Sequence, residues 1–143
     1  MLMMIPVWSW TLAAVFTPLG LLHLYWLLGG TRGIHAAIPT IADNKPLFQP
    51  GKLETAAVMA LLWIAAFWML LLGRELPGML PSWLVNTGGY LISAIFLIRS
   101  VGDFRYIGFF KRYRGSPFAR MDSRYYSPLC LALGASTLIL LLH

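Results

Sequence analysis

The chain has 143 residues, of which 59% are hydrophobic and only 11% charged, and its formal net charge is +6 at pH 7. Soluble domains usually carry about 25% charged residues, so this composition excludes an ordinary water-soluble domain and indicates an integral membrane protein of one domain. The single cysteine, Cys130, excludes an internal disulfide and argues against a cysteine-based metal site. The N-terminus lacks a basic n-region, so we expect no cleaved signal peptide.

Four apolar runs predict an all-α, integral membrane four-helix bundle. A helix of roughly 20 residues crosses a hydrocarbon core of ~30 Å, and in lipid only helices of this kind satisfy their own backbone. The fourth apolar run is short, so we expect its helix to begin earlier, near Asp122 or Ser123. The predicted spans cover residues 8–28, 53–72, 83–101 and 124–142, and the connectors that bear most charge cover residues 29–52 and 102–123.

The basic residues are distributed unevenly between the connectors. Ten of the eleven Lys and Arg residues lie in or beside the first and third connectors, and only Arg74 lies in the second. Cytoplasmic connectors of membrane proteins are enriched in Lys and Arg, so we predict that these two connectors are cytoplasmic and that both termini are on the non-cytoplasmic side. This placement indicates anionic lipid headgroups as partners, and it argues against nucleic acid.

This topology predicts that ionisable residues from all four spans gather at the cytoplasmic end of the bundle. Ionisable groups at membrane depth are costly and usually face the bundle interior, so we predict a polar pocket there. Arg99 and Asp103 are four residues apart and are predicted to pair on one helix face. The alternative is a polar plug that only holds the helix ends together. The gathered residues are His23, Glu54, Arg99, Asp103, Asp122 and Arg124.

His23 is the candidate catalytic residue, and its interpretation stays open. A histidine in an apolar helix is either a neutral, hydrogen-bonded structural residue, a proton-transfer group or a ligand of metal or haem. The other histidines, His35 and His143, are predicted to lie on a loop and at the far terminus, so we predict no metal site. Glu54 has the simpler alternative of a carboxylate in the first turn of its helix, where the macrodipole favours it.

The third connector combines aromatic and basic residues. Phe104, Ile107 and Phe110 recur every three residues, which is typical of a short amphipathic segment in the headgroup layer. The cations near them suggest either a positive-inside anchor or an Arg-lined pocket for phosphate or carboxylate. The first connector is long and rich in Gly and Pro, and it is predicted to cover the cluster. We predict as headgroup anchors Lys111, Arg112 and Arg114.

Three segments resemble a bacterial family called domain of unknown function 3995. They are LHLYWLLGG (22–30), RSVGDFRYIGFFK (99–111) and FARMDSRYYSPLC (118–130). The resemblance implies a small four-helix protein of the bacterial cytoplasmic (inner) membrane, and it implies no known activity. It places the family's pattern at His23, Trp26, Arg99, Asp103, Arg105, Phe109, Phe110, Lys111, Asp122, Arg124 and Cys130.

The leading functional hypothesis is a cytoplasmic-side pocket that binds an anionic amphiphile, such as a lipid headgroup or a phosphorylated isoprenoid, with or without enzymatic turnover. Arg99, Arg105 and Arg124 would hold the anion. The orienting and lining residues would be Asp103, Asp122, Glu54 and Trp26, with His23 as the proton-transfer group. The alternative is a non-enzymatic accessory or scaffold subunit. The sequence identifies no cofactor, and a homodimer or larger membrane complex stays open.

Overall fold

The computed structural model describes residues 4–41 and 45–143, and these are helical except for connectors and one isolated β-bridge between Thr40 and Pro46. Four segments are long and apolar enough to span a membrane. The prediction of an all-helical protein with four such segments is therefore confirmed. The helices are α1 (Met4–Leu27), α2 (Ile34–Ala37), α3 (Lys52–Leu72), α4 (Ser82–Val101), α5 (Pro117–Met121), a π-helical turn η2 (Asp122–Tyr126) and α6 (Ser127–Leu141).

The fourth helical segment begins at Pro117, earlier than expected, and runs without a break through α5, η2 and α6. Ser116 explains this start, because its Oγ accepts a hydrogen bond from the N–H of Ala119 at 3.0 Å. Proline suits the first helical turn, since the N–H that it lacks would have no helical partner there. The sequence Ser116–Pro117 thus sets the helix start.

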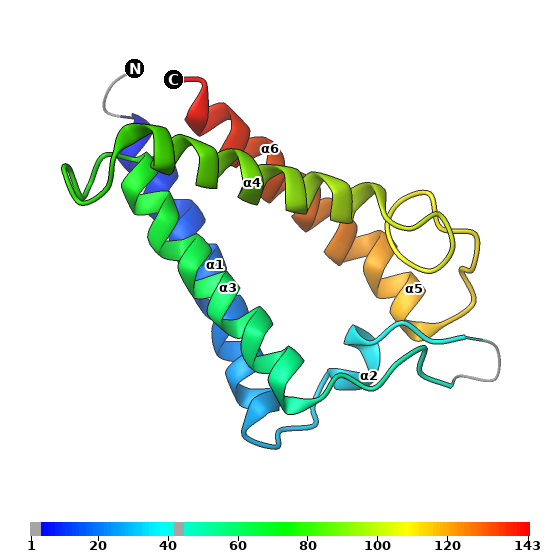
Figure 1. Cartoon of the computed structure of the whole chain (residues 1–143). Helices are drawn as coiled ribbons and strands as arrows, with labels where there is room; N and C mark the ends of the chain where they lie inside the picture. The colour runs from blue at the N-terminus through cyan, green and yellow to red at the C-terminus, as the bar shows by residue number, and fades with distance from the viewer. Residues whose placement is uncertain (1–3, 42–44) are drawn as a thin grey trace.

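The four long helices form two hairpins that meet at one end and diverge at the other (Figure 1). The first hairpin pairs α1 with α3, and the second pairs α4 with α6. We call the end where they meet the apex and the other end the open end. At the apex, Phe16 and Met69 are fully buried, and the rings of Phe16 and Phe96 are 5.3 Å apart. The apolar core therefore lies at the apex.

Small residues allow α4 and α6 to approach closely. Gly134 faces Leu97, and its carbonyl oxygen accepts a hydrogen bond from Ser93 Oγ at 2.8 Å. Thr137 connects the second hairpin to the first, since its Oγ1 lies 3.6 Å from the sulfur of Met69. In a membrane, such close packing and interhelical hydrogen bonds stabilise helix association, because lipid removes the hydrophobic drive between helices.

The first connector crosses the open end. It leaves α1, forms α2 beside α5, and returns to the start of α3 (Figure 1). Two backbone hydrogen bonds flank the bridge between Thr40 and Pro46: Leu47 N–H donates to Pro39 at 2.7 Å, and Ile41 N–H donates to Lys45 at 2.8 Å. The connector thus joins the diverging ends of the two hairpins.

Candidate functional site

Arg99, Lys111 and Asp122 form an ion cluster at the open end of the second hairpin. Arg99 Nη2 donates to Asp122 Oδ1 at 2.8 Å, and Lys111 Nζ donates to Oδ2 at 2.9 Å. Lys111 Nζ also donates to Gly108 O at 2.9 Å and to Ser123 Oγ at 2.7 Å. Asp122 is 0% exposed and Lys111 is 1% exposed. Lys111 therefore uses all three protons of its ammonium group. The ion cluster contains two cations and one carboxylate, so its net charge is +1.

The helical segment that carries Asp122 is locally widened. Asp122 begins the π-helical turn η2, and its carbonyl oxygen accepts a hydrogen bond from Ser127 N–H. Such turns occur frequently at functional sites. Ser127 is 0% exposed, and its hydroxyl has no hydrogen-bond partner among the described residues. Propensity and periodicity offer no signal for a π-turn, so the sequence did not predict this feature.

The loop between α4 and the ion cluster is closed by two glycines. Gly102 and Gly108 both have φ 88°, and a Cβ on either would overlap the backbone near the other. Phe109 N–H donates to Ser100 O at 2.8 Å, which completes the closure. Because Gly108 N–H also donates to Asp122 Oδ2 at 2.8 Å, the loop is fixed directly to the ion cluster.

Asp103 holds the interior of this loop. Its Oδ1 accepts hydrogen bonds from three consecutive backbone N–H groups at 2.7–2.9 Å, those of Arg105, Tyr106 and Ile107. Partial burial acts to raise the pKa of Asp103, but the hydrogen bonds outweigh it and hold that pKa below its ordinary value. Asp103 is therefore a carboxylate that orders the connector.

Two sequence predictions need correction. Asp103 does not pair with Arg99, because α4 ends at Val101 and Gly102 turns the chain away from the helix axis. The structure does not support Lys111 as a headgroup anchor, because its ammonium is buried and paired with Asp122. The charge of Lys111 predicts an exposed side chain. Its acidic partner, Asp122, lies eleven residues later in the chain, so the local sequence pattern does not indicate this ion pair.

The remaining cations of this region are exposed. Arg105 and Arg112 border a surface hollow of about 680 Å³ that also includes Tyr106 and Tyr113. The Arg105 guanidinium lies 5.3 Å from the ring centre of Tyr106, and that of Arg124 lies 5.4 Å from Tyr125. Arg114 is also exposed. The structure thus leaves these arginines at the surface and brings only Arg99 to Asp122.

His23 lies on the first hairpin with a defined orientation. Its Nδ1 is 2.8 Å from Leu19 O, and because a carbonyl only accepts, Nδ1 carries the proton and a neutral ring keeps a lone pair on Nε2. The ring packs edge-on against Trp26 with centres 5.0 Å apart, and Trp26 Nε1 donates to Arg32 O at 2.9 Å. The hydrogen bond to the Leu19 carbonyl matches the structural interpretation of this histidine.

The predicted gathering of six ionisable residues is only partly seen. Glu54 is exposed in the first turn of α3, on the first hairpin. Within residues 4–41 and 45–143, no ion pair or hydrogen bond joins His23 or Glu54 to the ion cluster. The divergence of the hairpins explains this separation. The end of α1, which carries His23, and the start of α3, which carries Glu54, lie at the open end of the other hairpin (Figure 1).

Helical register nevertheless places His23 and Arg99 on corresponding faces. His23 follows Phe16 by seven residues on α1, and Arg99 follows Phe96 by three residues on α4, so each shares a face with a ring of the apex contact. We call these two faces of α1 and α4 the inter-hairpin faces, over the part that runs from the Phe16–Phe96 contact toward the connectors.

Arg99 keeps one unpaired polar atom. Its Nη1 is buried and has no hydrogen-bond partner within the described part of the chain.

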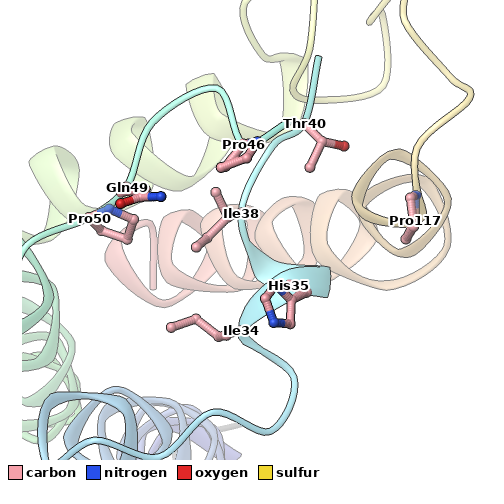
Figure 2. A pocket seen from close by; sticks show the side chains of 8 residues that line it. All are labelled: Ile34, His35, Ile38, Thr40, Pro46, Gln49, Pro50 and Pro117. Atoms are coloured by element: carbon pink, nitrogen blue, oxygen red, sulfur yellow. The ribbon is translucent and has the colours of Figure 1, made fainter. Parts of the chain in front are cut away.

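A pocket of about 670 Å³ lies between the first connector and the start of α5 (Figure 2). The connector supplies almost all of its lining, and α5 supplies Pro117. The lining residues are Ile34, His35, Ile38, Thr40, Pro46, Gln49, Pro50 and Pro117. No group of three or more His, Cys, Asp or Glu side chains that could hold a metal ion is found in the described ranges.

Residues 7–137 match a family model described as a protein of unknown function, DUF3995. The protein belongs to the DUF3995 family. The match covers α3, α4, both basic connectors and most of α1 and α6, so the ion cluster and the pocket lie within the DUF3995 region. No curated protein and no solved structure matches the chain. Family membership therefore confirms the resemblance seen in the sequence.

Proposed function

We propose that the protein binds an anionic amphiphile, with its phosphate or carboxylate at Arg99 and its apolar chains along the inter-hairpin faces. The observation that carries this proposal is the buried Nη1 of Arg99, which has no partner among the described residues. A buried donor without a partner costs about 1–3 kcal/mol, and an anionic oxygen at this position would offset that cost.

The charges of the ion cluster support an anion at Arg99 in particular. Lys111 uses all three of its protons, and both oxygens of Asp122 accept hydrogen bonds. The surplus positive charge is therefore available only through Arg99, whose side chain is 31% exposed. A guanidinium presents donors in a fixed fork, so one nitrogen can hold Asp122 while the other binds a ligand oxygen.

The surroundings of Arg99 suit an apolar chain. Ile95, four residues before Arg99 and therefore near it on the surface of α4, is 62% exposed. Since the hairpins diverge toward this end (Figure 1), the open end offers apolar helix surface beside a cation. With the positive-inside orientation, this arrangement would lie in the cytoplasmic leaflet of a bacterial inner membrane.

If the ligand is also turned over, His23 is the group we assign to proton transfer. Its proton on Nδ1 is held by Leu19 O, so a neutral ring would accept a proton at Nε2. His23→Gln would then reduce turnover and leave lipid retention unchanged. A loss of retention in His23→Gln would assign this residue to binding or folding instead.

Lipid retention tests the binding proposal. The protein is purified in mild detergent, and native mass spectrometry counts the bound anionic lipids of the wild type, Arg99→Gln and Arg99→Lys. We expect both variants to lose most of the bound anionic lipid. Arg99→Lys keeps a cation for Asp122, so it separates loss of the free donor from loss of the ion pair. Arg120→Gln, an exposed arginine of α5, is the matched control and should retain lipid. Unchanged lipid in both Arg99 variants would contradict the proposal.

A second candidate function is an accessory or scaffold subunit, which the full hydrogen bonding of Lys111 and Asp122 favours. In that case the ion cluster would only fix the connector to the helix end. The scaffold candidate predicts that Arg99→Lys, if stably folded, restores the function of a deletion strain. Failure of a stably folded Arg99→Lys protein to do so would favour ligand binding.

A further inference from the structure

The pocket between the first connector and α5 indicates which class of anionic lipid would bind, provided that the proposed function is correct. We infer that the ligand is a lipid whose phosphate carries a neutral polyol, such as glycerol, and that this polyol lies in the pocket of Figure 2. The inference depends on the lining chemistry, on one unpaired hydroxyl and on the position of the pocket relative to Arg99.

The lining combines polar side chains with flat apolar surfaces. The polar side chains are those of His35, Thr40 and Gln49, and the pyrrolidine rings of three prolines form much of the rest. None of the eight described lining residues is Lys, Arg, Asp or Glu. A neutral polyol needs no counter-charge in such a lining, and its hydroxyls can form hydrogen bonds with these polar side chains.

Thr40 provides an independent indication of a ligand. It is only 9% exposed, and its Oγ1 has no hydrogen-bond partner in the part of the chain that the structure describes. The bridge to Pro46 holds the Thr40 backbone in place. A hydroxyl both donates and accepts, so it complements the hydroxyl of a polyol in either direction.

The pocket lies close to the proposed anion position along the chain. Pro117 lines the pocket, and Asp122, the partner of Arg99, follows five residues later in the same helical segment. At a rise of about 1.5 Å and a turn of about 100° per residue, Asp122 lies about 7.5 Å farther along the helix axis and about 140° around it. A polyol on a phosphate held by Arg99 would therefore extend around this helical segment to place its terminal hydroxyl in the pocket.

Competition among lipids tests the inference. The protein is placed in phosphatidylcholine nanodiscs that contain equal amounts of phosphatidylglycerol, phosphatidic acid and phosphatidylserine with identical acyl chains, and native mass spectrometry identifies the lipids it retains. We expect the wild type to retain phosphatidylglycerol preferentially, because phosphatidic acid lacks the polyol and phosphatidylserine has an ammonium and a carboxylate in place of the hydroxyls. Thr40→Val should reduce this preference by about fivefold, the effect of one net hydrogen bond.

Controls separate the possible outcomes. Thr40→Val should keep or raise the melting temperature, because it removes an unpaired hydroxyl. Thr11→Val, whose hydroxyl bonds to Val7 O within α1, should leave the lipid preference unchanged. Equal retention of the three lipids by the wild type, or a preference that survives Thr40→Val, would overturn the inference. If the inference about the polyol fails in this way but Arg99→Gln still loses all three lipids, the proposed binding of an anionic amphiphile stands.

Discussion

The two ends of the molecule are held together by different forces. At the apex, the hairpins join through an apolar core around Phe16 and Met69, with Ser93 and Thr137 as buried polar contacts between helices. At the open end, the second hairpin is closed by an ion cluster, and the first connector joins the separated helix ends. The apex therefore sets how the hairpins are arranged, and the ion cluster fixes one hairpin and its loop.

This difference separates stability from ligand binding. Lys111 uses all three of its protons and both oxygens of Asp122 accept hydrogen bonds, whereas Arg99 and Thr40 each retain an unpaired polar atom among the described residues. Substitutions at the first pair should act mainly on folding. Substitutions at the second pair should act mainly on binding, and this distinction can be tested directly.

The largest effect is expected for Asp122→Ala. This substitution leaves the ammonium of Lys111 buried without its counter-ion, and removal of one partner from a buried ion pair typically costs about 3–5 kcal/mol. The free energy of unfolding in mixed micelles is the measurement. Ser123→Ala removes only a neutral partner of the same ammonium and should cost about 0.5–1.5 kcal/mol. Similar losses in both variants would show that the ion cluster does not stabilise the open end.

A smaller loss is expected for Gly134→Ala, at the contact between α4 and α6. A Cβ at this position would lie 2.8 Å from Leu97 Cγ and 3.0 Å from the Leu97 backbone nitrogen, so the helices must move apart. Extra methylene volume in a well-packed contact costs about 1–3 kcal/mol. Gly115→Ala is the matched control, because a Cβ there meets no atom within 4 Å. Equal stability of the two variants would show that close packing of α4 and α6 contributes little.

The apex was more predictable from the sequence than the open end. The length of each apolar run indicates a spanning helix, because lipid leaves the backbone no other solution. The start at Pro117 also has a local signal, since Ser116 is a favourable N-cap residue and Pro117 suits the first helical position. The glycine after Val101 was a signal for the end of α4, and it would have removed Asp103 from the helix face of Arg99.

The partners within the ion cluster could not be predicted in the same way. Arg99 and Asp122 are 23 residues apart, so their contact depends on how α4 and the α5–α6 segment cross, and local sequence pattern does not specify this. The burial of Lys111 depends on the closed loop that Gly102 and Gly108 permit. Local rules assign charges to surfaces, whereas buried charges depend on tertiary partners.

The smallest effect concerns the Asp103 loop and pH. Because the pKa of Asp103 is lowered in the folded protein, its contribution is fully present above the pKa of the unfolded chain, about 3.9, and is lost as pH falls through the lower folded value. We expect the amide NMR signals of the three N–H groups bonded to Asp103 to shift below about pH 4, with little change in global stability because Asp103 is largely exposed.

Two substitutions at Asp103 separate charge from hydrogen bonding. Asp103→Asn keeps an acceptor oxygen for the N–H groups of Arg105, Tyr106 and Ile107, so it should keep the loop ordered and abolish the acid transition. Asp103→Ala removes the acceptor and should lose amide protection at every pH, while the Arg99–Asp122 pair and lipid retention persist. An acid transition that survives Asp103→Asn would assign the titration to another group. Loss of lipid in Asp103→Ala would show that the loop contributes to the binding site, and the separation between stabilising and binding residues would then fail at this loop.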